Sequence, residues 1–292
     1  MIVAVSENSP EVPLIYRQNN LQSAELKPEW LIPEQKRYLF TGFVLPVKLG
    51  EQEVELPVMK VAENEAICWL DFRRPDLALA AAPVNAELIM GLPEKSILLI
   101  DTASSKSGAE MDMVSGLVKL GLNDQRIQRW TLRGGKRADL EQTGITEMTF
   151  IGEDGESELW FAVDGEGNIC HGVKCIPITG KATNEAKYFY WTQTEWREML
   201  QIIQANPDRS VVVWDDVYST GATLTGIEKL IRGKIAAENK LIEQRRNNKS
   251  ERVEGLISMK HFYKVVTAFE APEGVEPPSD LHYAVRIPVI FS

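Results

Sequence analysis

The sequence predicts an α/β fold with a mostly parallel, twisted sheet flanked by helices, and two observations carry this prediction. Short apolar runs typical of buried parallel strands recur at residues 96–100, 127–132, 211–214 and 262–269. Segments with helical spacing follow two of these runs, at residues 108–120 and 224–231. Because parallel neighbours need a long crossover connection, this strand–helix–strand order predicts that the four strands are neighbours in one sheet.

Further elements follow from local patterns. Alternation of apolar and polar residues around Leu49-Gly50-Glu51-Gln52 predicts a β-hairpin over residues 38–60. The helical spacing of Leu77–Met90 stops at Gly91-Leu92-Pro93. Antiparallel strands are expected within 146–178, with a turn at Asp164-Gly165-Glu166-Gly167, and a late strand within 281–291. Residues 192–204 are predicted to be helical.

Composition limits the functional classes. The 292 residues, 44% of them hydrophobic, are enough for a substantial core. A net charge of −10 argues against general affinity for nucleic acid or for an anionic membrane. Cys68, Cys170 and Cys175 give no disulfide framework, and neither a signal peptide nor a membrane-spanning apolar run is apparent. We therefore expect a cytoplasmic protein without nucleic-acid or membrane partners.

The most informative segment is residues 211–223, where a buried strand ends at two adjacent carboxylates. Asp215 and Asp216 are followed by a hydroxyl- and glycine-rich turn and then by a helix N-terminus, which favours phosphate. Gly221 lets the backbone approach an anion, while Thr220 and Thr223 add hydroxyl donors. The carboxylates suit vicinal hydroxyls, or water on Mg²⁺, beside that phosphate. The pattern therefore indicates a ribose 5-phosphate site, the alternative being an ordinary strand and turn.

This run resembles the fingerprint of the type I phosphoribosyltransferases: four hydrophobic residues, two acidic residues, an apolar residue, two variable residues and Thr-Gly-x-Thr. The resemblance implies that 5-phosphoribosyl 1-pyrophosphate binds here with Mg²⁺ held through Asp215 or Asp216, and that both aspartates are catalytic. The loop residues expected to bind the ligand are Val217, Tyr218, Ser219, Thr220, Gly221, Ala222 and Thr223.

The resemblance also bears on organisation. It implies an α/β core at residues 65–292, with a charged insertion near 232–254, and a small β-containing hood. Residues 1–64, an N-terminal extension with the hairpin, are the candidate hood. It further implies a magnesium-dependent enzyme of nucleotide metabolism that forms a homodimer.

A second loop follows the first core strand. In the resembling family a loop at this place contacts pyrophosphate, and here it is Ser105-Lys106-Ser107-Gly108. Lys106 is the available cation and is assigned a catalytic role, with Ser105 and Ser107 as ligand-binding residues. The alternative is a solvated loop with an N-capping serine.

A basic loop, Arg133-Gly134-Gly135-Lys136-Arg137, is expected after the next strand. The adenine-type enzymes carry a basic loop at this point, and Gly134 stands where their pattern has a lysine. Arg133 is therefore assigned a catalytic role, and Lys136 and Arg137 are assigned to ligand binding. A basic surface turn is the alternative.

A lid is expected in residues 178–191, where Lys181 or Lys187 could reach a phosphate. The aromatic run Tyr188–Trp191 within it is interpreted as core packing, the alternative being a platform on which a base stacks. Two metal patterns are rejected. Cys170, His171 and Cys175 lack a second ligand cluster, and the calcium-loop-like segment beginning at Asp164 lacks the required glycine and glutamate.

The predicted activity is phosphoribosyl transfer from 5-phosphoribosyl 1-pyrophosphate to a nitrogenous base, with release of pyrophosphate. The acceptor is expected to be a purine, as in purine salvage. Hypoxanthine-guanine enzymes have an aspartate before Thr-Gly, and Ser219 at that position disfavours a 6-oxopurine. Trp214 either alters the pocket or fills the sheet face. The alternative function is a non-catalytic regulatory protein that binds phosphoribosyl pyrophosphate or a nucleotide.

Overall fold

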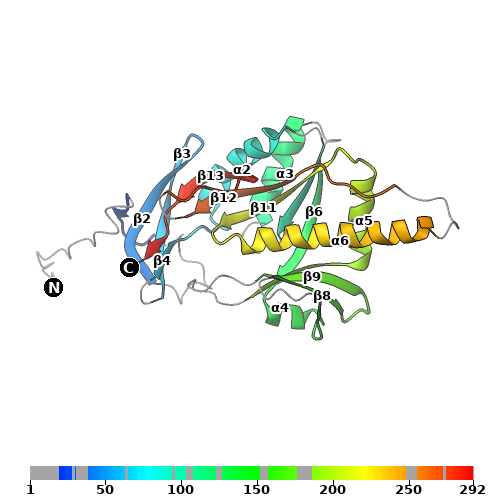
Figure 1. The fold of residues 1–292 in the computed structure, drawn as a ribbon. Coiled ribbons are helices and arrows are strands. Elements are labelled where there is room, and N and C mark those ends of the chain that lie inside the picture. The colour runs from blue at the N-terminus through cyan, green and yellow to red at the C-terminus, as the bar shows by residue number, and fades with distance from the viewer. Residues whose placement is uncertain are drawn as a thin grey trace, which may run out of the picture.

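The computed structural model describes residues 20–27, 30, 39–62, 65–93, 96–102, 108–122, 127–151, 157–175, 186–247, 255–271 and 274–291 (Figure 1). The helices are α2 (Pro75–Met90), α3 (Gly108–Leu122), α4 (Arg137–Gln142), α5 (Gln193–Gln204) and α6 (Ala222–Asn247). The strands of the larger sheet are β5 (Ile97–Thr102), β6 (Ile127–Gly135), β7 (Thr149–Ile151), β8 (Ser157–Val163), β9 (Ile169–Cys175), β10 (Lys187–Thr192), β11 (Ser210–Tyr218), β12 (Phe262–Glu270) and β13 (Leu281–Ile287). Those of the smaller sheet are β1 (Gln22–Ser23), β2 (Leu39–Leu49), β3 (Gln52–Ala62), β4 (Glu65–Cys68) and β14 (Ile290–Phe291).

The larger sheet has nine strands in the order β13-β12-β11-β5-β6-β10-β9-β8-β7. From β13 to β6 all neighbours are parallel. The four strands predicted to be neighbours are β5, β6, β11 and β12, and they do lie side by side. Crossover helices α3 and α6 connect β5 to β6 and β11 to β12, as parallel pairing requires.

The prediction of a mostly parallel sheet is wrong, because the sheet is mixed. Strand β10 pairs antiparallel with β6, and β9, β8 and β7 continue the sheet in antiparallel pairs. The connection between β8 and β9 is a tight turn in which Asp164 accepts hydrogen bonds from the Glu166 and Asn168 N–H groups. A turn this short can only join antiparallel strands. The antiparallel strands expected within 146–178 therefore extend the core sheet itself.

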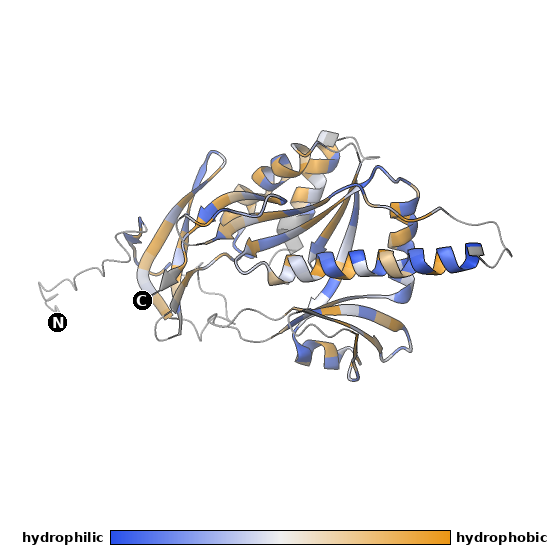
Figure 2. Ribbon diagram, viewed as in Figure 1, coloured by the Kyte–Doolittle hydropathy of each residue, from blue (hydrophilic) through white to orange (hydrophobic). Residues whose placement is uncertain are grey.

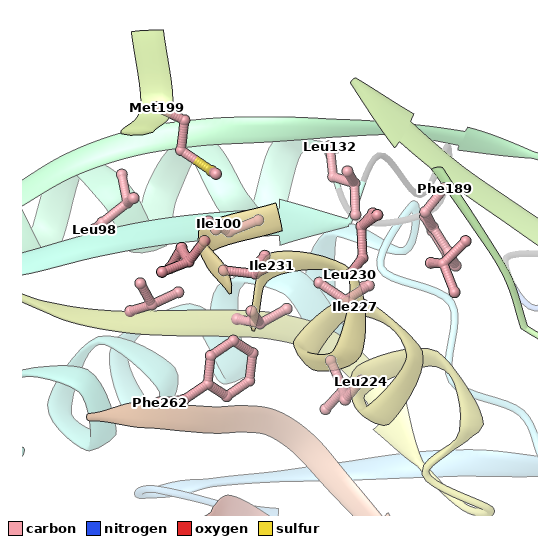
Figure 3. Packing of buried hydrophobic residues seen from close by; sticks show 14 of the residues in the cluster. Leu98, Ile100, Leu132, Phe189, Met199, Leu224, Ile227, Leu230, Ile231 and Phe262 are labelled. Atoms are coloured by element: carbon pink, nitrogen blue, oxygen red, sulfur yellow. The ribbon is translucent and has the colours of Figure 1, made fainter. Parts of the chain in front are cut away.

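Helices cover both faces of the parallel strands. Leu98 and Ile100 of β5 pack in one buried cluster with residues of α5 and α6, as Figure 3 shows for Met199, Leu224, Ile227 and Ile231. Ile97 and Leu99, which alternate with them, pack on the other face with α2 and α3. The side chains of a strand point alternately to opposite faces, so the apolar runs of β5 and β11 are buried on both.

Trp214 belongs to the second of these faces. It is fully buried, and its ring centroid lies 6.3 Å from that of Phe72. It packs in the cluster with α2 and α3, whereas α6, which begins at the phosphate loop, lies on the opposite face. Of the two interpretations of Trp214, the structure supports filling of the sheet face.

The smaller sheet has the order β1-β2-β3-β4-β14 and contains the predicted hairpin, β2 and β3. Its apolar face packs on α2 and on residues of β12 and β13 through a third buried cluster. β4 lies beyond residue 64, and β14 comes from the other end of the chain, so this sheet also draws on residues outside 1–64. Its assignment as a hood stays a prediction.

The segment predicted as a charged insertion continues α6 as far as Asn247, and residues 248–254 lie outside the described part. Hydrophilic residues become more frequent along the far half of this helix, while the strands it crosses are largely hydrophobic (Figure 2). Among the described residues, no helix is both long and apolar enough to cross a membrane.

Candidate functional site

The carboxyl end of β11, the following turn and the start of α6 border one open hollow on the surface. It is lined by Asp215, Val217, Tyr218, Ser219, Thr220, Gly221, Ala222, Thr223 and Leu224. All but Leu224 belong to the fingerprint, so folding brings its carboxylate and its glycine- and hydroxyl-rich turn to the same surface. Strand β11 ends here between two parallel neighbours, β5 and β12. Ligands of open α/β sheets bind at such strand ends.

The turn after β11 leads directly into the N-terminal end of α6. Gly221 has a φ of 72°, a left-handed conformation that favours glycine, and its carbonyl accepts from the Thr225 N–H at 2.9 Å. The Thr220 hydroxyl accepts the Ala222 N–H at 3.4 Å, a long hydrogen bond. The N–H groups of a first helical turn have no acceptor within the helix, and the helix dipole adds positive potential there. This end of α6 is therefore suited to an anion.

Asp215 is buried rather than solvent-facing, with 6% of its surface exposed. Its Oδ1 accepts from the Thr102 hydroxyl on β5 and from the Asp216 N–H, both at 3.0 Å. Burial raises the pKa of Asp215 to about 7, and the adjacent Asp216 carboxylate adds to the rise, while Lys187 opposes it. A buried carboxyl group with a pKa raised to this extent is typical of functional sites.

Asp216 differs from its neighbour. It is half-buried, and its Oδ1 accepts from the Val217 N–H at 2.8 Å. Within the described ranges, no cluster of three or more metal-ligating side chains occurs. A magnesium ion here would take one or two protein carboxylates and complete its shell with ligand oxygens and water, which is the usual manner of Mg²⁺ binding.

Strands β9 and β10 approach the same loop from the side. Cys175, the last residue of β9, lies with its Sγ 3.9 Å from the Thr223 carbonyl oxygen. Burial raises the pKa of this thiol to about 12, so it is a neutral, weak donor. Lys187, the first residue of β10, pairs in register with Cys175 and affects the pKa values of both Cys175 and Asp215. The structure thus places the exposed Lys187 at the start of β10, near Asp215, and its predicted contact with a phosphate stays a prediction.

The close approach of β9 to α6 depends on Gly226. A Cβ atom on Gly226 would lie 2.5 Å from Cys175 Sγ, whereas the next nearest atom, Cγ2 of Val173, would be 3.5 Å away. Gly226→Ala is therefore expected to lower the free energy of unfolding by about 1–3 kcal/mol, as overpacking does. Urea denaturation measures this change.

The same substitution in a Cys175→Ala background removes the clash. There, Gly226→Ala is expected to be neutral or to stabilise by up to about 1 kcal/mol, because alanine is the better helix former. Gly116→Ala in α3, where an added Cβ meets nothing within 4 Å, is the matched control and is expected to stabilise. Equal losses from Gly226→Ala in both backgrounds would contradict this account.

The basic residues assigned to pyrophosphate have other partners in the structure. Arg133 donates to Glu195 Oε1 through Nε at 3.1 Å and Nη2 at 2.8 Å. It lies on β6, two strands from β11, and β6 continues to Gly135 because Arg133–Gly135 pair with Tyr188–Tyr190 of β10. The expected loop at 133–137 is thus largely strand and helix.

Two further basic residues follow β6. Lys136 occupies the N-cap position of α4, and its N–H donates to Asp139. Arg137 donates to Glu141 and to the Thr146 carbonyl. Ser105, Lys106, Ser107 and Lys181 lie outside the described residues. The roles assigned to all these residues stay predictions. The buried run Tyr188–Trp191 was correctly interpreted as core packing.

Sequence reasoning missed Thr102 and Cys175 as neighbours of the site. β5 and β11 were predicted to be neighbours in one sheet, and Thr102 lies two residues after the predicted first strand, so its position was a signal for contact with Asp215. No local signal marked Cys175, because its position depends on the antiparallel extension of the sheet.

No protein-family model and no curated protein sequence matches this chain. Among solved structures, the chain is similar to a hypoxanthine phosphoribosyltransferase from Staphylococcus aureus, with 10% identity and a TM-score of 0.35, over 73% of this chain and 74% of that one. It is also similar to a purine phosphoribosyltransferase from Pyrococcus horikoshii, with 15% identity and a TM-score of 0.30, over 73% and 86%. A third similar structure is a hypothetical protein from Neisseria gonorrhoeae with bound ppGpp, at 9% identity and a TM-score of 0.33, over 75% and 82%.

Proposed function

We propose that this chain transfers the phosphoribosyl group of 5-phosphoribosyl 1-pyrophosphate to a purine-type base, with release of pyrophosphate. The observation that carries the proposal is the shared hollow at the end of β11, where the buried carboxyl of Asp215 and the open first turn of α6 lie side by side. An anion site next to a carboxyl group is what a ribose 5-phosphate needs, because one sugar carries both the phosphate, on C5, and the vicinal hydroxyls, on C2 and C3.

In this proposal each part of the loop has a separate task. The N–H groups of residues 221–223, with the hydroxyls of Ser219, Thr220 and Thr223, bind the 5-phosphate. Asp215 and Asp216 accept hydrogen bonds from the ribose hydroxyls and so fix the position of C1 relative to the acceptor nitrogen. The transition state is oxocarbenium-like, and the negative potential of the two carboxylates favours the positive charge that develops on the sugar.

The carboxylates also fit a magnesium ion. Asp215 is buried beside Asp216, and its pKa is raised chiefly by burial and further by the adjacent Asp216 carboxylate. A divalent cation held through Asp215 or Asp216 would compensate the charge of the carboxylates and would neutralise charge on the departing pyrophosphate. Lys106, Arg133 and the lid lysines are proposed to contact the same leaving group.

Ser219 bears on the acceptor. It occupies the place where the hypoxanthine-guanine enzymes have an aspartate, and it lines the hollow. This supports a purine other than a 6-oxopurine. A homodimer in the cytoplasm, with residues 1–64 as part of the hood, belongs to the same proposal.

The second candidate is a regulatory protein that binds the sugar donor without catalysis. The arrangement of Arg133 favours it, because its guanidinium is held by Glu195 and so is engaged away from the hollow. That ion pair is half-exposed and therefore contributes little to stability, so a ligand can compete with Glu195 for Arg133. The two candidates differ only in turnover.

Pyrophosphate release decides between them. The protein is incubated with 5-phosphoribosyl 1-pyrophosphate and Mg²⁺ and with a panel of purine and pyrimidine bases, and pyrophosphate is measured. Base-dependent release is expected, and Asp216→Asn is expected to reduce it by at least about 100-fold, the scale of a lost transition-state contact. Asp208→Asn, an exposed substitution near the opposite end of β11, is the matched control and should leave release unchanged. Donor binding without release for any base would favour the regulatory protein, and no donor binding would exclude both.

A further inference from the structure

The side chain of Tyr218, the last residue of β11, turns back over the loop that follows it. A Cβ atom on Gly221 would lie 2.2 Å from Tyr218 Oη, 2.5 Å from Cζ and 2.9 Å from Cε2. The phenol end therefore fills the space into which any larger residue at 221 would project. Gly221 is needed for this contact as well as for its backbone conformation.

The Tyr218 ring packs against a row of aromatic side chains from β12 and β13. Tyr218 pairs in register with Phe269 of β12, and their ring centroids lie 6.0 Å apart. Phe269 in turn lies 5.3 Å from the ring of Tyr283 on β13, with the Arg286 guanidinium 5.3 Å from its centroid. Aromatic pairs at such separations attract one another beyond simple burial. The phenol thus has a rigid support in the parallel sheet.

The Tyr218 hydroxyl reaches the first turn of α6. Burial raises the pKa of Tyr218, and a side-chain hydrogen bond with Thr225 acts in the opposite direction. The phenol is therefore neutral and available as a hydrogen-bonding group. Because the Thr225 N–H also donates to the Gly221 carbonyl, Thr225 contacts both Gly221 and the Tyr218 side chain. These contacts link the end of β11, the turn and the start of α6 to one another.

We propose that Tyr218 is a positioning residue for the phosphate loop: its ring and hydroxyl hold residues 219–225 in the conformation that presents the N–H groups of residues 221–223 to the phosphate. This inference rests on the proposed function, in which that loop binds the 5-phosphate. A loop with a glycine at its centre has many accessible conformations, and a ligand must otherwise supply the free energy that orders it. A loop ordered in advance binds more tightly without any added ligand contact.

A double-mutant cycle on ribose 5-phosphate binding, measured by calorimetry, tests the inference. Tyr218→Phe keeps the ring and removes the hydroxyl, and Thr225→Val removes its partner. Each single substitution is expected to weaken binding about 3- to 10-fold, the value of one hydrogen bond. The double variant is expected to be no weaker than the worse single variant, since both remove the same interaction. Tyr218→Leu, which also removes the ring, is expected to lose more.

Hydrogen exchange of the ligand-free protein gives a second readout. Tyr218→Phe is expected to speed exchange of the amides of residues 219–225, while Tyr283→Phe, the matched control at the other side of Phe269, leaves them unchanged. If wild-type protein binds ribose 5-phosphate and Tyr218→Phe binds it equally well, or if the two single effects add, the inference is overturned and the proposed function stands. If wild-type protein does not bind ribose 5-phosphate, the proposed function fails and the inference fails with it.

Discussion

Replacement of Asp215 by asparagine is expected to stabilise the fold above pH 7 by about 2–4 kcal/mol, while it abolishes binding of the sugar donor. The folded protein holds Asp215 at a pKa of about 7, against an ordinary value of 3.8, chiefly because the group is buried. Between these two values the folded state retains a proton that the unfolded chain has lost. The contribution of Asp215 to the free energy of unfolding is therefore fully present below about pH 4 and is lost as the pH rises to 7.

Asparagine is neutral at every pH, so the free energy of unfolding of Asp215→Asn does not fall in this way as the pH rises. Its amide oxygen can still accept from the Thr102 hydroxyl and from the 216 N–H. Chemical denaturation of both proteins from pH 4 to pH 8 should give curves that coincide at the acid end and separate with rising pH. Separation in the opposite sense would contradict the buried, raised-pKa description of Asp215.

Asp101→Asn is the matched control. Asp101 is buried in β5, in register with Trp214, and accepts from Arg129 Nε at 2.6 Å and from the Thr131 hydroxyl at 3.1 Å. Loss of this charge removes an ion pair, so the substitution is expected to destabilise by about 1–3 kcal/mol. Two buried aspartates on adjacent strands should thus respond with opposite signs. The difference identifies Asp215 as a residue kept for binding at a cost in stability.

Gly221→Ala is expected to have the second large effect, on both stability and phosphate binding. Alanine must adopt the left-handed φ of 72° there and must also displace the Tyr218 phenol. The first costs about 1–2 kcal/mol and the second a further 1–3 kcal/mol or so, as overpacking does. Displacement of Tyr218 would also release the loop, so ribose 5-phosphate binding should fall by more than the 3- to 10-fold expected for Tyr218→Phe.

Gly167→Ala separates the two costs. Gly167 has a φ of 86° in the turn between β8 and β9, and an added Cβ meets nothing within 4 Å. Gly167→Ala is therefore destabilised only by the left-handed backbone that alanine must adopt. Urea denaturation of the two variants should show a greater loss for Gly221→Ala, and the double variant Gly221→Ala with Tyr218→Ala should recover only the steric part. Equal losses at 221 and 167 would show that the Tyr218 contact is not tight.

The parallel half of the fold was predictable because its signals are local. The apolar runs of β5 and β11 and the helical spacing between strands depend only on neighbouring residues, and they gave the correct strand neighbours. Of the antiparallel half, β7, β8 and β9 were predicted as strands, but β10 lies largely in the segment predicted as a lid, and the attachment to β6 was not predicted. That attachment depends on the pairing of Arg133–Gly135 with β10, and a non-local pairing has no signature in either segment alone.

The candidate site shows the same division. Its turn and acidic pair follow from contiguous residues, and the fold brings eight of the nine fingerprint positions from 215 to 223 to one hollow. The burial of Asp215 does not follow from the motif, because Thr102 and the neighbouring strands enclose it. Burial is a property of the surroundings, so a motif predicts which groups are present but not their pKa values.

The pairing of β14 with β4 has a consequence for how the chain folds. Ile290 and Phe291 are hydrogen-bonded neighbours of Ala66 and Glu65, and helices α2 to α6 and the entire larger sheet lie between them in sequence. Such a contact closes a very long loop, and contacts of this kind form late because the chain entropy lost is large. Synthesis reaches β14 only after every strand of the larger sheet, so until then the smaller sheet has an open edge beside β4. Its hairpin can form early, but the sheet is completed only after the larger sheet has been synthesised.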